Sequence, residues 1–189
     1  MKKYRVLMSA ALAFMLSLSL IACADNEDIA ETPSQDTAIH QTGTVTDEGY
    51  ENKTYNLRFT LPEGYVMFNN TLIDAQAVGN TKYEMVAEHS SGYPRVMVIA
   101  ETTDAEDVNA YLENLRNVVS STDFTLSEIA DYEIAGRNFR YFTAERTDGT
   151  IQTFYAEKCG DEYVCISVAD LKDFPTDESV AISSFSAYN

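Results

Sequence analysis

Residues 137–168 read RNFRYFTAERTDGTIQTFYAEKCGDEYVCISV, and apolar and polar side chains alternate through three runs of this stretch. Alternation with a period of two is typical of β-strands that have one face on a core. The segments TDG at 147–149 and GD at 160–161 separate the runs, and Asp-Gly between apolar stretches is a strong hairpin signal. The stretch therefore predicts three antiparallel strands, at residues 138–146, 150–159 and 163–168.

The sequence on either side of this stretch predicts further strands and helices. An amphipathic helix is indicated from Val108 to Val119 by apolar residues at helical spacing, with Asp104 as its N-cap. A second helix is expected over residues 177–185, with Thr176 as its cap, and a short third helix over residues 71–78. Alternating or apolar runs predict the remaining strands, at residues 55–61, 82–89, 94–101 and 124–134.

These elements define one folded domain. No internal repeat or second core is visible after residue 53, and helices and strands are mixed without a regular βαβ alternation. We therefore expect a single α+β domain at residues 53–189, in which helices flank an antiparallel sheet.

The N-terminal segment has the features of an export signal. Lys2, Lys3 and Arg5 precede an apolar run that is shorter and weaker than the roughly 20 residues of a membrane span. The run ends in LIAC at 20–23, which resembles the lipobox of bacterial lipoproteins. The resemblance implies that residues 1–22 are a signal peptide and that Cys23 is acylated, which would anchor the protein outside the cytoplasm on a bacterial membrane. The alternative is an ordinary secretory peptide in which Cys23 has no role.

Residues 23–52 are expected to form a flexible tether after the lipidated cysteine. From Ala24 to Glu51 the chain carries eight acidic residues and no Lys or Arg, and its apolar residues are isolated. Such a composition cannot bury enough apolar surface to offset the entropy of ordering. The alternative is an acidic interaction tail.

The charge of the chain excludes some partners. Thirteen Lys and Arg residues against thirty Asp and Glu give a formal charge of −17, and removal of residues 1–22 would take away three cations and leave −20. Nucleic-acid binding requires a basic surface, so no nucleic-acid partner is expected. The sequence contains no phosphate-binding loop, dinucleotide fingerprint or Cys/His zinc spacing, so neither a cofactor nor a metal is predicted.

The order of the predicted elements resembles a known family. A strand, the turn LPEGY at 61–65, a hairpin, an amphipathic helix and a meander containing GRNFRY at 136–141 and ending in Ser184-Phe185 are similar to PsbP-like proteins. The resemblance covers roughly residues 53–188 and implies an αβα sandwich. It carries no catalytic residues across, because the proteins of this fold mostly act as binding or assembly factors.

Cys159 and Cys165 lie on either side of a predicted turn. If the loop has three residues, 161–163, the two cysteines face each other and a disulfide is favoured in an oxidising compartment. If the loop has two residues, 160–161, Cys159 pairs with Glu162 and Cys165 with Ala156, and the thiols are poorly placed. Both registers are open from the sequence alone.

The meander also carries a candidate binding face. Tyrosine combines stacking area with a polar tip, and the cationic side chains of this acidic domain gather on the same strands. The candidate residues are Arg137, Arg140, Tyr141, Tyr155, Lys158 and Tyr163. The alternative is that the tyrosines are half-buried sheet residues and that the cations pair across strands with Glu133, Glu145 and Glu157.

No catalytic set is recognisable in the sequence. His89-Ser90-Ser91-Gly92 is better explained as the polar tip of a hairpin than as a nucleophile with its base, because sequence neighbours rarely form such a pair. The expected function is therefore a non-catalytic binding or assembly module of the cell envelope, with an envelope protein as its partner. The alternatives are an extracytoplasmic hydrolase of glycans or peptides and a carrier of a small ligand.

Overall fold

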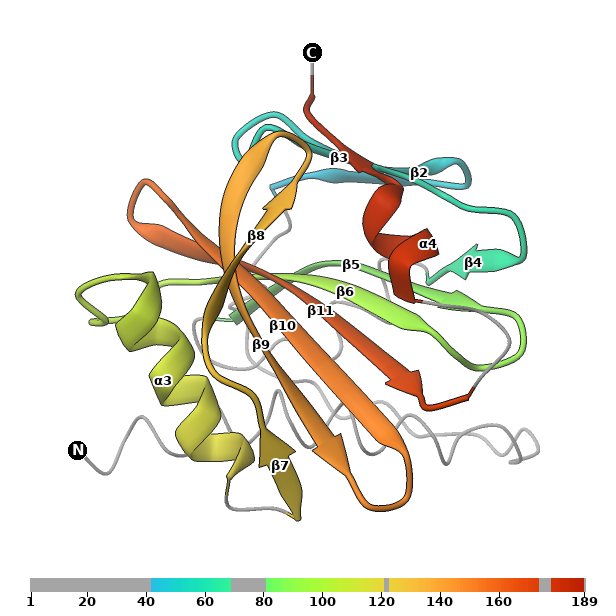
Figure 1. Ribbon diagram of the computed structural model, residues 1–189. Coiled ribbons are helices and arrows are strands. Elements are labelled where there is room, and N and C mark those ends of the chain that lie inside the picture. Colours follow the sequence, from blue (N-terminus) through green and yellow to red (C-terminus); the bar gives the residue numbers. More distant parts are fainter. Residues whose placement is uncertain (1–41, 69–80, 121–122, 174–177, 189) are drawn as a thin grey trace, which may run out of the picture.

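The computed structural model describes residues 42–68, 81–120, 123–173 and 178–188 (Figure 1). The small sheet contains β1 (Thr44–Thr46), β2 (Gly49–Asn52), β3 (Leu57–Thr60) and β12 (Phe185–Ser186). The large sheet contains β4 (Tyr65–Met67), β5 (Thr81–His89), β6 (Arg95–Glu101), β7 (Phe124–Leu126), β8 (Ala130–Ile134), β9 (Arg137–Arg146), β10 (Thr150–Cys159) and β11 (Glu162–Leu171). The described residues also contain two helices, α3 (Val108–Val119) and α4 (Glu178–Ser183).

Both sheets are antiparallel throughout the described residues. The small sheet has the order β1-β2-β3-β12, and the large sheet has the order β4-β5-β6-β11-β10-β9-β7 with β8 paired to β9. In Figure 1 the small sheet and α4 lie above the large sheet, and α3 lies below it. The domain is therefore α+β as predicted, but a second sheet, together with α4, covers the face opposite α3.

The large sheet packs against a hydrophobic core on each of its two faces, and its central strands carry apolar residues at nearly every position. On β11, Val164, Ile166 and Val168 belong to the core under the small sheet. The intervening Tyr163 and Cys165 belong to the core under α3. Burial on both faces explains why this stretch reads as a nearly continuous apolar run rather than as a strict alternation.

The predicted meander is confirmed as β9, β10 and β11, although β9 begins at Arg137 rather than Asn138 and β11 extends to Leu171 rather than Val168. β11 begins at Glu162 rather than at Tyr163, because the turn before it has two residues and Cys159 pairs with Glu162. Gly149 and Gly160 have φ angles of 89° and 63°, which the turns require and other residues rarely adopt.

Several predicted boundaries differ from the observed ones. Asp107, not Asp104, caps α3, since its carboxylate accepts the N–H of Ala110 at 2.8 Å. The strand predicted at 124–134 is two strands, β7 and β8. Phe185 belongs to β12 and not to the last helix. The predictions for residues 71–78, Thr176 and Asp177 lie outside the described residues.

The predicted tether, residues 23–52, overlaps the folded domain. Composition assigns residues 42–52 to it, yet they form β1 and β2 and place Tyr50 fully inside the core. The close fit explains Gly43, because a Cβ atom there would lie 2.3 Å from the Tyr50 ring. The predictions of a signal peptide at 1–22 and of lipidation at Cys23 concern residues outside the described part of the chain.

A buried carboxylate holds the start of the small sheet onto the large one. β5 has an irregular register between Tyr83 and Met85, and this bulge turns Glu84 toward the small sheet. Glu84 is fully buried. Its carboxylate accepts the Thr42 and Gly43 N–H groups at 3.0 and 2.9 Å, and it also accepts the Thr42 Oγ1, Tyr50 hydroxyl and Asn52 Nδ2 groups.

Replacement of Glu84 by glutamine tests this anchor. In Glu84→Gln a neutral amide replaces a carboxylate that accepts hydrogen bonds from five donor groups. The NH₂ group of the amide cannot accept hydrogen bonds, so some of these donors lose their acceptor. We expect the free energy of unfolding to fall by about 2–4 kcal/mol in urea titrations, and we expect amide exchange at Gly43 to accelerate. Glu63→Gln, at an exposed position, is the matched control. Equal stability of the two variants would contradict the anchoring role.

Candidate functional site: a tyrosine platform

Three tyrosines from adjacent strands form an aromatic cluster, here called the tyrosine platform: Tyr132, Tyr141 and Tyr155. The Tyr141 and Tyr155 rings are stacked, with centroids 5.4 Å apart and an interplanar angle of 20°. Tyr132 packs edge-on against Tyr141 at 5.5 Å and tilted against Tyr155 at 5.0 Å. Such offset and edge-to-face contacts are the favourable geometries for aromatic pairs.

Strand register brings these rings together. Tyr141 is the direct partner of Tyr155 between β9 and β10, and it also pairs with Ala130 of β8. The turn from β8 to β9 is Ala135-Gly136, and both residues have positive φ angles, 56° and 73°. Two such residues make a type I′ hairpin turn, which fixes the register and places Tyr132 on the same face as Tyr141.

The platform is graded from buried to exposed. Tyr155 is 2% exposed and belongs to the core under the small sheet, whereas Tyr132 is 39% exposed and is the outermost ring. Burial, followed by the charge of Glu178 on α4, raises the pKa of the Tyr155 hydroxyl. Glu178 also accepts a hydrogen bond from Thr153 Oγ1 at 3.1 Å. The cluster thus offers a rigid apolar surface with hydroxyl and carboxylate groups beside it.

The six residues predicted as one binding face do not share a face. Tyr141, Tyr155 and Arg137 point toward the small sheet, but Arg140, Lys158 and Tyr163 alternate to the side of α3. Tyr163 is 1% exposed and stacks on Tyr111 at 4.7 Å, so its ring serves the core. The prediction of a single face is therefore wrong, because strand alternation separates residues an odd number of positions apart.

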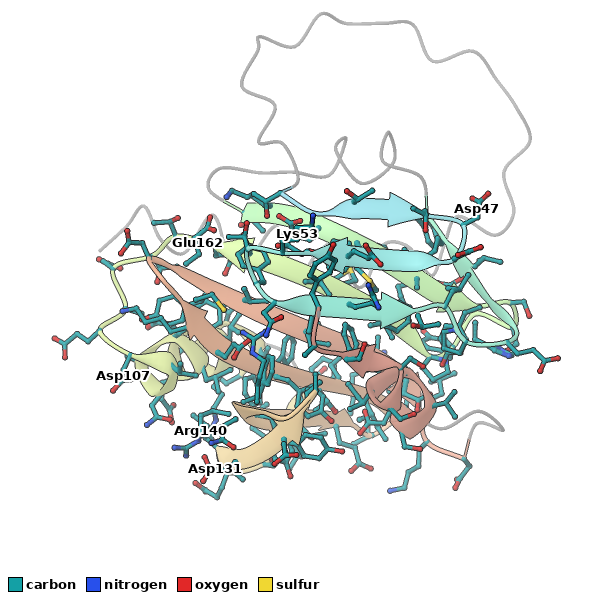
Figure 2. All side chains as sticks on the ribbon, turned by 90° about the horizontal axis from the view of Figure 1, so that it is seen from above. Asp47, Lys53, Asp107, Asp131, Arg140 and Glu162 are labelled. Atoms are coloured by element: carbon teal, nitrogen blue, oxygen red, sulfur yellow. The ribbon has the colours of Figure 1, made fainter. Side chains whose placement is uncertain are left out.

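The cations of the meander are bound within the domain. Arg137 forms an ion pair with Glu157 and donates to the Asn56 carbonyl oxygen at 3.2 Å, which ties β9 to the small sheet. Arg140 pairs with Asp131 at 3.0 Å, and Figure 2 shows the two side chains beside each other. Of the expected acidic partners, Glu157 binds Arg137 as predicted, whereas Glu145 pairs with Lys172.

The two cysteines of the domain are free and lie on opposite faces of the sheet. Cys159 pairs with Glu162 and Cys165 with Ala156, so the two-residue loop is the one that forms. Cys165 is 1% exposed, and burial raises the pKa of its thiol. Burial also raises the pKa of Cys159, despite the Arg137 guanidinium 3.1 Å from its sulfur. The register that would allow a disulfide is therefore wrong.

The His89–Ser91 loop holds a local hydrogen bond. His89 Nδ1 contacts Ser91 Oγ, and the Ser91 N–H donates to the same nitrogen at 3.3 Å. The bond spans two residues at the tip of the β5–β6 hairpin, so it closes the turn.

In the described residues, no group of three or more His, Cys, Asp or Glu side chains is placed to hold a metal ion. No helix among those residues is long and apolar enough to cross a membrane.

Sequence reasoning misses Tyr132, Glu178 and Glu84. Tyr132 lies in a stretch whose pattern predicts one continuous strand at 124–134, and that pattern does not indicate its pairing with β9. The sequence signal for it is Ala135-Gly136 between two apolar runs, which marks a hairpin but not which face the tyrosine takes. The burial of Glu84 depends on a bulge, for which the sequence contains no signal.

A thiol titration checks the positions of the cysteines. In a full-length Cys23→Ser chain purified without reductant, we expect two reactive thiols in denaturant. In the native state Cys159 should react first, while Cys165 should wait for unfolding because it is buried. Cys159→Ser and Cys165→Ala variants identify each phase. A chain that shows no free thiol in denaturant would contradict the observed register.

The buried tyrosines predict loss of stability at alkaline pH. Burial is the largest cause that raises the pKa of five hydroxyls, to about 12 for Tyr83, and the other four are Tyr50, Tyr55, Tyr111 and Tyr155. Above about pH 10 the unfolded chain releases these protons and the folded chain retains them, so the free energy of unfolding falls as pH rises. Urea titrations at pH 7, 9 and 11 measure the fall, and absorbance at 295 nm follows ionisation. Ionisation of all tyrosines near pH 10 without unfolding would contradict it.

Comparison with known proteins supports the fold. No protein-family model and no curated protein sequence matches the chain. The solution structure of cyanobacterial PsbP (CyanoP) from Synechocystis sp. superimposes with a TM-score of 0.50 and 11% identity, and the match covers 82% of this chain and 98% of that one. A crystal structure from Bacteroides thetaiotaomicron has a TM-score of 0.45 and 8% identity, covering 77% of this chain and 50% of that one. The resemblance to CyanoP supports a PsbP-like fold for this chain.

Proposed function

We propose that this protein is an extracytoplasmic lipoprotein, anchored through Cys23, whose domain is a non-catalytic binding module of the cell envelope. The tyrosine platform is the surface that binds its partner, an envelope protein. In the finer classification of the fold, the domain corresponds to the αβα sandwich of PsbP-like proteins. The acylated cysteine holds the protein at the membrane, and the acidic segment before residue 42 separates the domain from it.

The observation that carries the binding role is the exposed Tyr132 ring, supported from behind by two further tyrosines. A large apolar ring that remains 39% exposed offers contact area, and its packing against Tyr141 and Tyr155 reduces the entropy lost on binding. Tyrosine is among the residues that most often dominate binding energy at protein interfaces. Arg137 has no place in this surface because it pairs with Glu157, and Lys158 and Tyr163 have none because they lie on the side of α3.

Membrane anchoring is tested first. Wild-type chain expressed in a bacterial host should fractionate with membranes and should incorporate labelled palmitate. Cys23→Ser should abolish both, because no thioether can form on a serine side chain. Cys159→Ser is the matched control and should remain lipidated. A Cys23→Ser chain that stays with the membrane fraction at high salt would contradict the lipid anchor.

The platform is tested by partner capture from native membranes. We expect Tyr132→Ala to weaken capture of the partner about tenfold or more, because truncation of a tyrosine that dominates an interface costs about 2 kcal/mol or more. Val66→Ala is the matched control, since Val66 is 51% exposed on β4 at the other edge of the large sheet. A peptide of residues 23–52 alone should capture nothing. Equal capture by the Tyr132→Ala and wild-type chains, or capture by the peptide alone, would overturn the proposal.

A further inference from the structure

The strand that carries Tyr132 has an open edge. Within the described residues β8 pairs with one strand, β9, along residues 137–141, while β7 pairs with residues 144–146 of the same strand. Residues 130–133 of β8 are all exposed. An edge strand exposed in this way presents unpaired backbone groups that can pair with another extended chain.

The hairpin register identifies which backbone groups face outward. Ile134 and Arg137 close the two-residue turn and therefore form a hydrogen-bonded pair. Because the pattern alternates, the N–H and C=O groups of Ile134, Tyr132 and Ala130 point to β9. Those of Asp131 and Glu133 point away from the sheet, where an added strand would meet them.

The side chains of β8 determine which charge on an added strand is favourable. Asp131 and Glu133 lie on the side of α3, and Asp131 has a side chain that is 81% exposed although Arg140 pairs with it (Figure 2). Tyr132 lies on the other side, with the platform. Opposite charges stabilise residues that face each other across strands, and like charges destabilise them. A second copy of this acidic chain would place carboxylates against carboxylates.

We infer that the β8 edge binds an extended segment of a partner protein in which basic and apolar residues alternate. The basic residues lie opposite Asp131 and Glu133, and the apolar residues extend the stack that begins at Tyr132. The segment adds a strand to the large sheet, so its backbone contributes affinity and its side chains contribute specificity. This inference rests on the proposed function, since it assigns a partner chemistry and a binding mode to the surface around Tyr132.

The test uses the full chain with Cys23→Ser, labelled with ¹⁵N, and the capped peptides (Lys-Val)₃ and (Glu-Val)₃. We expect (Lys-Val)₃ to bind at least tenfold more tightly than (Glu-Val)₃ and to protect the Asp131 and Glu133 amides from exchange. Glu133→Pro removes one outward N–H and should therefore weaken binding about tenfold. The variant should still fold, because proline is tolerated at a strand edge. Glu133→Gln keeps that N–H and should weaken binding less, with a smaller dependence on salt.

The outcomes separate this inference from the proposed function. Equal binding of the two peptides, protection at other amides only, or unchanged binding by a folded Glu133→Pro chain would each overturn strand addition. Loss of membrane capture in Tyr132→Ala together with full capture in Glu133→Pro would overturn it too, while leaving the platform as the partner surface. Protection of the Asp131 and Glu133 amides by (Lys-Val)₃ supports the edge even if Tyr132→Ala leaves membrane capture unchanged. Dimerisation of the chain through β8, detected by sedimentation, would identify a second copy as the occupant and overturn the basic partner.

Discussion

The carboxylate of Glu84 is the contact on which the arrangement of the two sheets depends. It is fully buried, and the groups that donate to it come from the first ten or so described residues of the chain, including Thr42 and Tyr50. β1 and β2 have three and four residues, which is too short for an independent hairpin to be stable in water. These strands are stable because their donor groups bind the buried Glu84 carboxylate and because Tyr50 packs in the core. The cover that they provide in turn keeps the inner face of the large sheet dry.

Much of the large sheet could be predicted from the sequence, because its signals are local. Alternation and Asp-Gly turns locate β9 and β10 almost to the residue, and the apolar stripe locates α3. The two arrangements of Cys159 and Cys165 differ by a single residue in one loop, and sequence patterns rarely define a turn that sharply. The candidate binding face is split for another reason: Arg140 and Tyr141 are consecutive on one strand, so alternation places them on opposite faces in any register.

The small sheet could not be predicted, because its strands are short and its contacts are distant in sequence. Residues 42–52 contain Val45 and Tyr50 among polar and acidic neighbours, a composition that favours a tether. Their folding depends on Glu84, more than thirty residues later, and on β3. For the tyrosine platform, the sequence supplies Tyr141 and Tyr155, but the outer ring and the carboxylate beside it come from β8 and α4. Only the tertiary structure brings those elements to the same place.

The pairing of β12 with β3 has a consequence for how the chain is made and, under the proposed function, exported. Phe185 lies opposite Phe59, and their ring centroids are 4.8 Å apart. The ribosome adds the residues from Thr60 to Phe185 in about 6 to 25 s, at rates of roughly 5 to 20 residues per second. During that time the small sheet has no fourth strand and the core beneath it stays open at one side. A nascent chain that cannot yet complete its fold stays largely unfolded. A translocation channel for unfolded polypeptides accepts a chain in that state. In an exported chain, the pairing of β12 with β3 would therefore complete the small sheet on the far side of the membrane.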